Sequence, residues 1–187
     1  MEQLSQFGSV HACDPSLRED SITEFGPIFG CSVERADIFP DKYYDATLLL
    51  DVIEHVQDDV ALLREAHRVT KKGGIVIVTV PAYQALWTTH DEDNHHLRRY
   101  SPTHFRSTLE SASLRVEKMG ALFLWSAVVK YIMGRYEDLT GAEFRGSSIP
   151  MPLVNRVLTA ITFWEGVIML RLGLMGGSSL FAVCSVR

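Results

Sequence analysis

The chain has 187 residues, 47% of them hydrophobic and 22% charged, which are ordinary values for a globular domain. This length predicts a single domain with a sizeable core. The net charge of −5 argues against a nucleic-acid-binding surface, which needs a basic patch. Three cysteines lie in apolar, strand-like contexts, and no signal peptide is evident, so we expect a cytoplasmic protein with reduced thiols at Cys13, Cys31 and Cys184.

The first 40 residues predict two short strands with a helix between them. A helix ends near residue 7, with Gly8 as its stop, and residues 9–13 form a strand that leads to Asp14. A helix over residues 17–29 precedes a second strand at 31–34, which leads to Asp37. Each acid has a plain structural alternative, since Asp14 can cap a helix and Asp37 can form a turn before a proline.

The apolar run over residues 45–50 shows no polar alternation, which predicts a strand buried on both faces. It stops at Asp51, where the sequence continues V-I-E-H. Ligands of open α/β sheets bind beyond the carboxyl ends of strands. We therefore expect Asp14, Asp37 and Asp51 to line one pocket at that edge.

A crossover helix and a second buried strand follow. Asp58 and Asp59 can cap a helix with an apolar stripe, and Gly73-Gly74 supply a left-handed stop. Residues 75–80 are apolar and precede Pro81. Strand, helix and strand make one right-handed βαβ unit.

The stretch from 86 to 101 is the most polar part of the chain and holds three closely spaced histidines: His90, His95 and His96. A metal site here would need a sharply folded loop, and the sequence indicates no second cluster of ligands elsewhere, so we predict no metal. One alternative is a solvated loop that Arg–Asp pairs hold in place.

The last third of the chain predicts a helix capped by Ser101, a strand over 115–119 and a final strand over 179–186. Between them lie two apolar segments, 121–134 and 154–174, separated by a polar loop over 135–152. The segments can form a helical cap over the substrate mouth that rests on a membrane surface, or they can simply cover the sheet. Neither is an uninterrupted membrane span.

Taken together, D-V-I-E-H-V at 51–56, L-R-E at 63–65, K-G-G at 72–74 and V-P at 80–81 resemble the class I S-adenosylmethionine-dependent methyltransferases. The likeness is closest to those acting on small molecules and glycans. It implies a doubly wound, mostly parallel Rossmann-like α/β sheet over residues 1–187. Residues 1–118 would be the cofactor-binding core, 119–176 a helical insertion and 177–187 the last strand. A nicotinamide-dependent dehydrogenase is disfavoured, because no G-x-G-x-x-G follows a strand.

The resemblance also implies roles for individual residues. Asp14 matches the acceptor for the ribose hydroxyls, while Asp37 and Ile38 match the residues at the adenine. Asp51 and His55 match further cofactor-binding positions of S-adenosylmethionine. The segment 86–101 resembles one found in methyltransferases of sugar and lipid-linked substrates. It implies that His96 is the general base. The same likeness places the substrate at Arg98 and Tyr100.

The family's glycine-rich E/D-x-G-x-G loop after a first central strand has no counterpart in the sequence. We therefore expect an amino-terminally truncated methyltransferase that does not bind S-adenosylmethionine tightly alone. We expect 10–12 and 47–50 to be separated by a gap, or forced together without the usual strand between them. The implied reaction is methyl transfer to an oxygen or nitrogen of a small molecule, glycan or lipid-linked substrate. The alternative is an inactive or partner-dependent remnant of such an enzyme.

Overall fold

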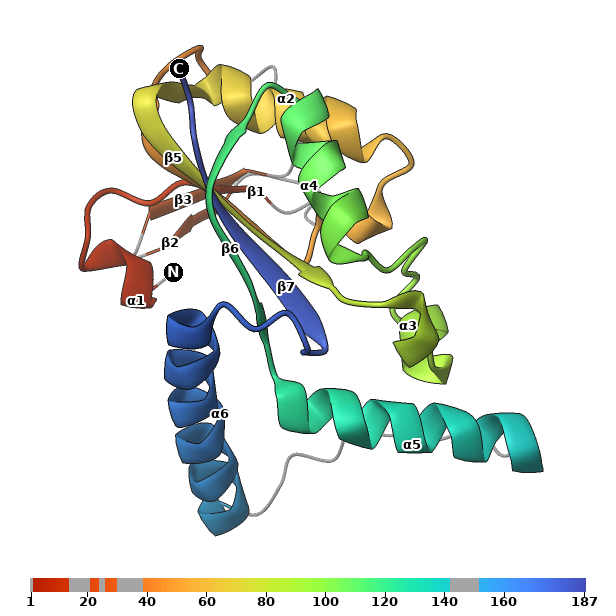
Figure 1. Cartoon of the computed structure of the whole chain (residues 1–187). Coiled ribbons are helices and arrows are strands. Elements are labelled where there is room, and N and C mark those ends of the chain that lie inside the picture. The colour runs from red at the N-terminus through yellow and green to blue at the C-terminus, as the bar shows by residue number, and fades with distance from the viewer. Residues whose placement is uncertain (1, 14–20, 24–25, 30–38, 142–151) are drawn as a thin grey trace.

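The computed structural model describes residues 2–13, 21–23, 26–29, 39–141 and 152–187 (Figure 1). Three predicted cofactor-binding residues lie outside the described residues: Asp14, Asp37 and Ile38. The strand predicted over 31–34 also lies outside them.

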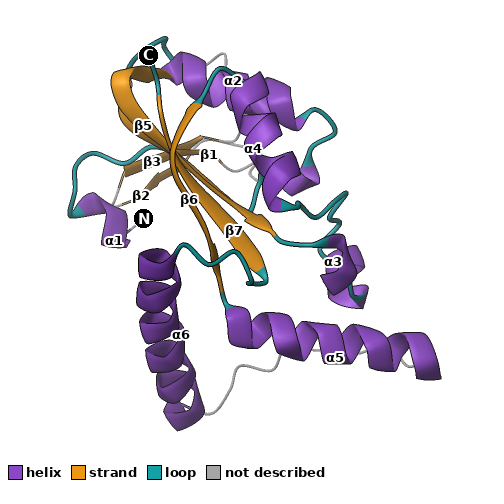
Figure 2. Ribbon diagram, viewed as in Figure 1, coloured by secondary structure: helices purple, strands orange, loops and turns teal. Residues whose placement is uncertain are grey.

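A four-stranded mixed sheet forms the centre of the molecule (Figure 2). Its order is β4-β5-β7-β6, with bounds Tyr44–Leu50, Thr70–Pro81, Ser179–Ser185 and Arg115–Leu122. β4 and β5 are parallel, whereas β7 runs antiparallel to both β5 and β6. The open sheet with helices confirms the predicted Rossmann-like α/β class.

The crossover unit forms as predicted, apart from its glycine pair. α2 spans Asp59–Val69, and the Asp58 carboxylate accepts a hydrogen bond of 2.8 Å from the backbone N–H of Ala61. Gly73-Gly74 do not end this helix, because β5 already begins at Thr70. They lie within the strand, where Gly73 has φ +78° and a Cβ on Gly74 would stand 2.9 Å from the Asp45 carbonyl oxygen. Glycine thus permits an irregularity in the β4–β5 register there.

The prediction that β4 is buried on both faces is wrong for this structure. Leu49 is 7% exposed, but its neighbour Leu50 is 50% exposed. β4 pairs with β5 on one side and with no other strand of the described part of the chain. It is therefore an edge strand there, and only the face that carries Leu49 belongs to the core.

The remaining helices confirm most of the predicted ones. α4 (Pro102–Ser111) has Ser101 as its N-cap and lies beside α2, and each contacts a strand of the sheet. α5 (Leu124–Thr140) and α6 (Pro152–Leu172) extend from one end of the sheet (Figure 1). The polar loop predicted over 135–152 is wrong for its first six residues, since α5 continues to Thr140. Among the described residues, no helix is both long and apolar enough to span a membrane.

The amino-terminal part forms a separate small sheet. After α1 (Glu2–Ser5), β1 (Ala12–Cys13), β3 (Gly26–Phe29) and β2 (Ser21–Thr23) pair in that order. The helix predicted over 17–29 is wrong for the described residues, because β2 and β3 pair antiparallel and Gly26-Pro27 disfavours a helix interior. The His11 ring contacts the Tyr44 hydroxyl at 2.8 Å, which ties this sheet to the start of β4.

Two other expectations concern the same region. β1 and β4 belong to different sheets in the described structure, which agrees with the expected separation of 10–12 from 47–50. The expectation of three reduced thiols is wrong for Cys13, which is disulfide-bonded. Cys184 is a free thiol buried in β7. An apolar context does not by itself distinguish a buried thiol from a bridged one.

The two faces of β4 give a direct test of its packing. We expect Leu49→Ala to lower the free energy of unfolding by about 2–5 kcal/mol, because it leaves a cavity in the core. Leu50→Ala is the matched control one residue away, and it should cost less than about 1 kcal/mol. Urea denaturation of both variants measures the difference, and equal losses would contradict an edge position for β4.

Candidate functional site

The candidate site begins where β4 ends. Asp51 has φ +52°, and its backbone N–H donates to the Thr79 carbonyl at 3.1 Å and to the Thr79 hydroxyl at 3.0 Å. A positive φ is uncommon for a residue with a side chain, and aspartate tolerates it better than most. The turn leads into the short helix η2 (Ile53–His55) and leaves Asp51 exposed at the predicted edge of the sheet.

Glu54 lies in η2 and is completely buried, a position that the sequence analysis did not single out. Neither of its carboxyl oxygens has a hydrogen-bond partner on another described residue. Burial raises the pKa of Glu54 to about 8, and the charges of Asp51 and Asp91 add to this effect. The signal in the sequence is a charged residue directly after a strand, but the sequence cannot show that its carboxyl group points inward.

The polar stretch after β5 contains more helix than predicted. η3 (Gln84–Leu86) is followed by α3 (Thr89–Asp93), and the Asp91 carboxylate accepts from the backbone N–H of Thr88 at 3.0 Å. The same carboxylate accepts two hydrogen bonds of 2.9 Å from the buried guanidinium of Arg99. Burial raises the pKa of Asp91, but the bonds and charge of Arg99 outweigh this and lower it.

His96 completes the cluster and faces the end of β4. Its Nδ1 lies 2.8 Å from Asp91 Oδ1, and its ring stands nearly perpendicular to that of His55, with 4.8 Å between centroids. Burial lowers the pKa of His96, and the bond to Asp91 offsets this only in part. The imidazole is therefore favoured in its neutral form. An N–H on Nδ1 that donates to Asp91 leaves the lone pair on Nε2.

Arg98 and Tyr100 hold the loop against the rest of the protein. Arg98 donates to Asp59 at 3.2 Å and to two backbone carbonyls, and the Tyr100 hydroxyl donates to Asp59 at 2.7 Å. Tyr100 has no exposed surface, so the predicted substrate-binding role does not fit its position. The alternative of a loop held by Arg–Asp pairs describes this part of the structure well.

Lys130 approaches the same region from α5. Burial, followed by the charge of Arg99, lowers the pKa of its ammonium group, while Asp91 and Asp51 act in the opposite direction. Its helix α5 also contacts η3, the turn at the start of the polar stretch. The sequence offered a signal, a lone lysine within the apolar run 121–134, but that signal does not say which way the side chain points.

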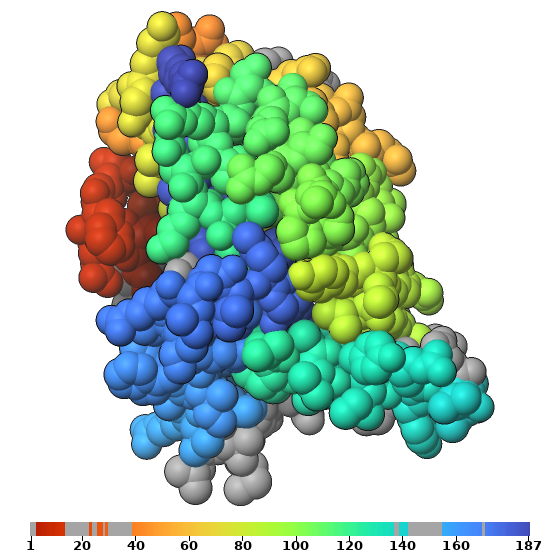
Figure 3. Space-filling view, in the orientation of Figure 1, coloured from red at the N-terminus to blue at the C-terminus, as the bar shows by residue number. Residues whose placement is uncertain are grey.

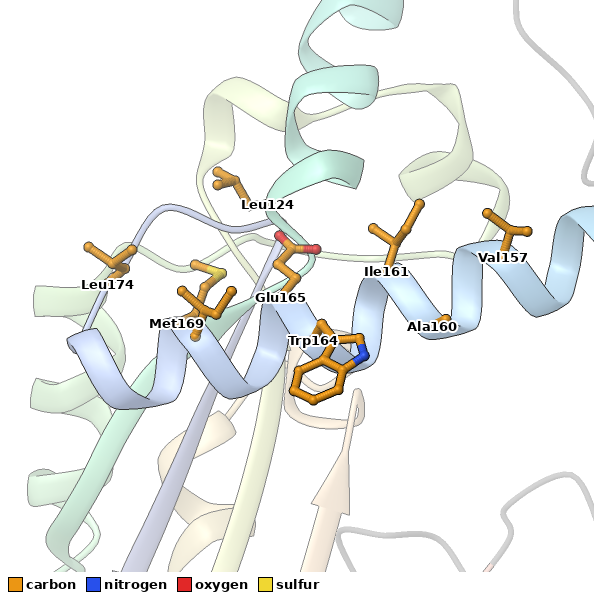
Figure 4. A pocket seen from close by; sticks show the side chains of 9 residues that line it. Leu124, Val157, Ala160, Ile161, Trp164, Glu165, Met169 and Leu174 are labelled. Carbon is orange, nitrogen blue, oxygen red and sulfur yellow. The ribbon is translucent and has the colours of Figure 1, made fainter.

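An apolar groove of about 640 Å³ lies along α6 (Figure 4). Leu124 of α5 and Leu174 contribute to it, and the rest of its lining comes from α6: Val157, Ala160, Ile161, Trp164, Glu165, Ile168 and Met169. Figure 3 shows α5 and α6 on one face of the molecule, next to each other at the end of the sheet. Trp164 is 64% exposed, so the groove is open to solvent.

Comparisons with known proteins agree with this architecture. A family model described as a methyltransferase domain matches residues 2–78. One solved structure is a complex of the Haloferax volcanii Trm112 methyltransferase activator with a protein described as a methyltransferase. That protein is 16% identical to this chain. Its TM-score is 0.60, and the match covers 100% of this chain and 76% of that chain. No curated protein matches the sequence.

Two further solved structures are similar. A SAM-dependent methyltransferase from Thermotoga maritima has a TM-score of 0.58 at 15% identity, covering 98% of this chain and 76% of that chain. A SAM-dependent methyltransferase from Archaeoglobus fulgidus has a TM-score of 0.54 at 17% identity. The match covers 98% of this chain and 80% of that chain. At such identities the structures show the fold, which is that of the class I methyltransferases. The family model over residues 2–78 and the fold of these structures together support a class I methyltransferase domain.

The buried ion pair gives a test of how the site is held. We expect Asp91→Ala to lower the free energy of unfolding by about 3–5 kcal/mol, because it leaves the Arg99 charge buried and unpaired. Glu110→Ala is the control, since it removes an exposed pair with Arg106 and should cost no more than about 1 kcal/mol. Urea denaturation compares the two, and a loss below about 1 kcal/mol for Asp91→Ala would contradict the buried pair.

Proposed function

We propose that this domain transfers a methyl group from S-adenosylmethionine to an oxygen or nitrogen of a small molecule, glycan or lipid-linked acceptor. The observation that carries the proposal is the Asp91–His96 pair, which stands beside His55 at the carboxyl end of β4. Asp51 lies at the same edge, since it directly follows β4 and precedes η2. The protein's contribution would be to position the reactants and to accept a proton.

The acidic edge of the sheet suits the proposed methyl donor. S-adenosylmethionine supplies an electrophilic methyl group on a positively charged sulfur. Asp51 is exposed and carries an acceptor carboxylate, and His55 beside it is also exposed. We propose that these two residues hold part of the donor. Asp14, Asp37 and Ile38 remain proposed contacts on the strength of the family resemblance.

His96 is the proposed base. Its Nδ1 is engaged by Asp91, which orients the ring and leaves Nε2 to accept a proton from the acceptor. The pKa of His96 lies below its ordinary value, so the ring is unprotonated at neutral pH. Lys130 and the partly exposed Arg98 are the cations that could attract an anionic part of the acceptor.

The apolar groove favours a lipid-linked acceptor over a free sugar. Apart from Glu165, its lining residues are apolar, and burial of a hydrocarbon chain there would be favourable. α5 and α6 also expose large apolar side chains, among them Ile132, Phe163 and Trp164. We propose that these helices bring the domain to the surface where such an acceptor resides, through peripheral contact.

A second candidate is a methyltransferase-like subunit that needs a partner. The outer edge of β4 pairs with no other strand of the described structure, and such an edge is a template for strand addition. One structurally similar protein occurs in a complex with a methyltransferase activator. We propose this role as the alternative to a domain that acts alone.

Calorimetric titration with S-adenosylmethionine distinguishes the two candidates. If the domain acts alone, we expect saturable binding that Asp51→Ala weakens by at least about 10-fold, since a charged hydrogen bond contributes about 1.5–3 kcal/mol. Asp45→Ala is the control, because Asp45 lies at the other end of β4 and pairs with Lys71. Absence of binding by the unmodified chain would contradict the first candidate and support the second.

A transfer assay tests the base and the acceptor class together. With methyl-labelled S-adenosylmethionine and a cell extract, we expect the label to enter the organic-soluble lipid fraction. His96→Gln should lower the rate by about 10²-fold or more, because it removes the proton acceptor.

His95→Asn is the matched control for this assay. His95 is exposed and has φ +57°, a conformation that asparagine tolerates. The rate of this variant should match that of the unmodified protein. Label that appears only in water-soluble products would contradict a lipid-linked acceptor, and an unchanged rate in His96→Gln would contradict the base.

A further inference from the structure

A buried carboxyl group without a partner is the feature that the proposed reaction leaves unexplained. Both oxygens of Glu54 are shielded from solvent and accept no hydrogen bond from another residue of the described structure. Burial of an unpaired polar group costs several kcal/mol on some scales, so such groups are rare and call for a ligand or a function. Among the described residues, Arg99 is the cation whose charge lowers the pKa of Glu54, and its guanidinium is already bonded to Asp91.

Two imidazoles face this carboxyl group. His55 Nε2 lies 4.0 Å from Glu54 Oε1, and the His96 ring packs against the His55 ring. One ligand atom from each of Glu54, His55 and His96 lies within 4.8 Å of the other two. We propose that these three side chains bind a divalent transition-metal ion of the zinc type. The sequence analysis predicted no metal because it found no ligands outside the histidine-rich stretch. In the structure, Glu54 and His55 supply such ligands next to His96.

The chemistry of these side chains selects the kind of ion. Two imidazoles and one carboxylate are the ligand set of many three-residue zinc sites, whereas Mg²⁺ and Ca²⁺ prefer oxygen ligands. Ligands of a tetrahedral zinc ion stand about 2.1 Å from the metal and therefore about 3.4 Å from each other. Binding would draw the three side chains together by about 1 Å, a movement within the reach of side-chain rotation.

The surroundings already provide the outer contacts that metal sites use. A histidine ligand usually donates its second ring N–H to a carboxylate, which orients the ring toward the ion. Asp91 occupies this position for His96, at 2.8 Å. Asp51 adds further negative charge close to Glu54. Asp91 therefore orients the His96 ring, and Asp51 places negative charge beside the cluster, while a bound ion would displace the proton that burial favours on Glu54.

A bound ion would change how an acceptor is activated. Three protein ligands leave a coordination position for a substrate oxygen, and the ion lowers the pKa of a hydroxyl bound there. The same ion takes the lone pair of His96 that a base would use, and it takes the His55 ring from its proposed contact with the donor. The loaded protein would thus activate its acceptor through the ion. Binding itself does not depend on the proposed methyl transfer, because its test needs neither donor nor acceptor.

Titration with CoCl₂ tests the site in the chelator-treated chain. We expect one Co²⁺ per chain, visible d–d absorption and displacement of that absorption by ZnCl₂. Glu54→Gln and His96→Gln should each weaken the affinity by at least about 10-fold, the smallest loss usual even for outer contacts of metal sites. Native mass spectrometry measures the stoichiometry independently.

His95→Asn is again the matched control, since it alters an exposed histidine of the same loop outside the cluster. Its cobalt affinity and spectrum should not change. Glu54→Gln keeps the size of the side chain and removes an unpaired buried acid, so we expect the variant to fold. Circular dichroism checks this. The proposal is overturned if no d–d absorption appears, if Glu54→Gln binds cobalt as well as the unmodified chain, or if His95→Asn loses the ion.

Discussion

The carboxylate of Asp91 is the point on which the site depends. It accepts from the backbone of Thr88, from two nitrogens of Arg99 and from the ring of His96. One side chain thus caps the short helix α3, neutralises a buried cation and orients an imidazole. Since Arg99 also donates to the carbonyl of Ala82, beyond the end of β5, the polar loop is anchored directly to the sheet. The geometry of His96 therefore follows from a buried electrostatic network.

The fold was largely predictable because strong local patterns agree with one another. The apolar run of β4, the capped helix α2 and the apolar run of β5 each carry a clear signal, and parallel pairing follows from the crossover between them. The failures have physical causes. Hydrophobicity predicts that a strand is apolar, but it does not say what covers each face, so the exposure of Leu50 could not be foreseen.

The site was predictable only in part, because its residues meet through tertiary contacts. The motif around β4 indicated Asp51 and His55, and the histidine-rich loop indicated His96. No feature of the neighbouring sequence showed that the Glu54 side chain points into the core, or that the Tyr100 hydroxyl donates to Asp59. The roles of Arg98 and Tyr100 were predicted from the resemblance of segment 86–101 to known methyltransferases, whereas the structure ties both residues to α2. Sequence thus locates the polar segments, and packing decides which side chains are available.

The placement of β7 has a consequence for biosynthesis. Ser179–Ser185 inserts between β5 and β6, so Val78 pairs with Ala182 and Met119 pairs with the same residue from the other side. These partners lie far apart in the chain, and contacts of this kind slow folding. On the ribosome, the position between β5 and β6 stays vacant until β7 has emerged. Until then β5 and β6 each present an unpaired strand edge, the state in which chaperones have most to protect.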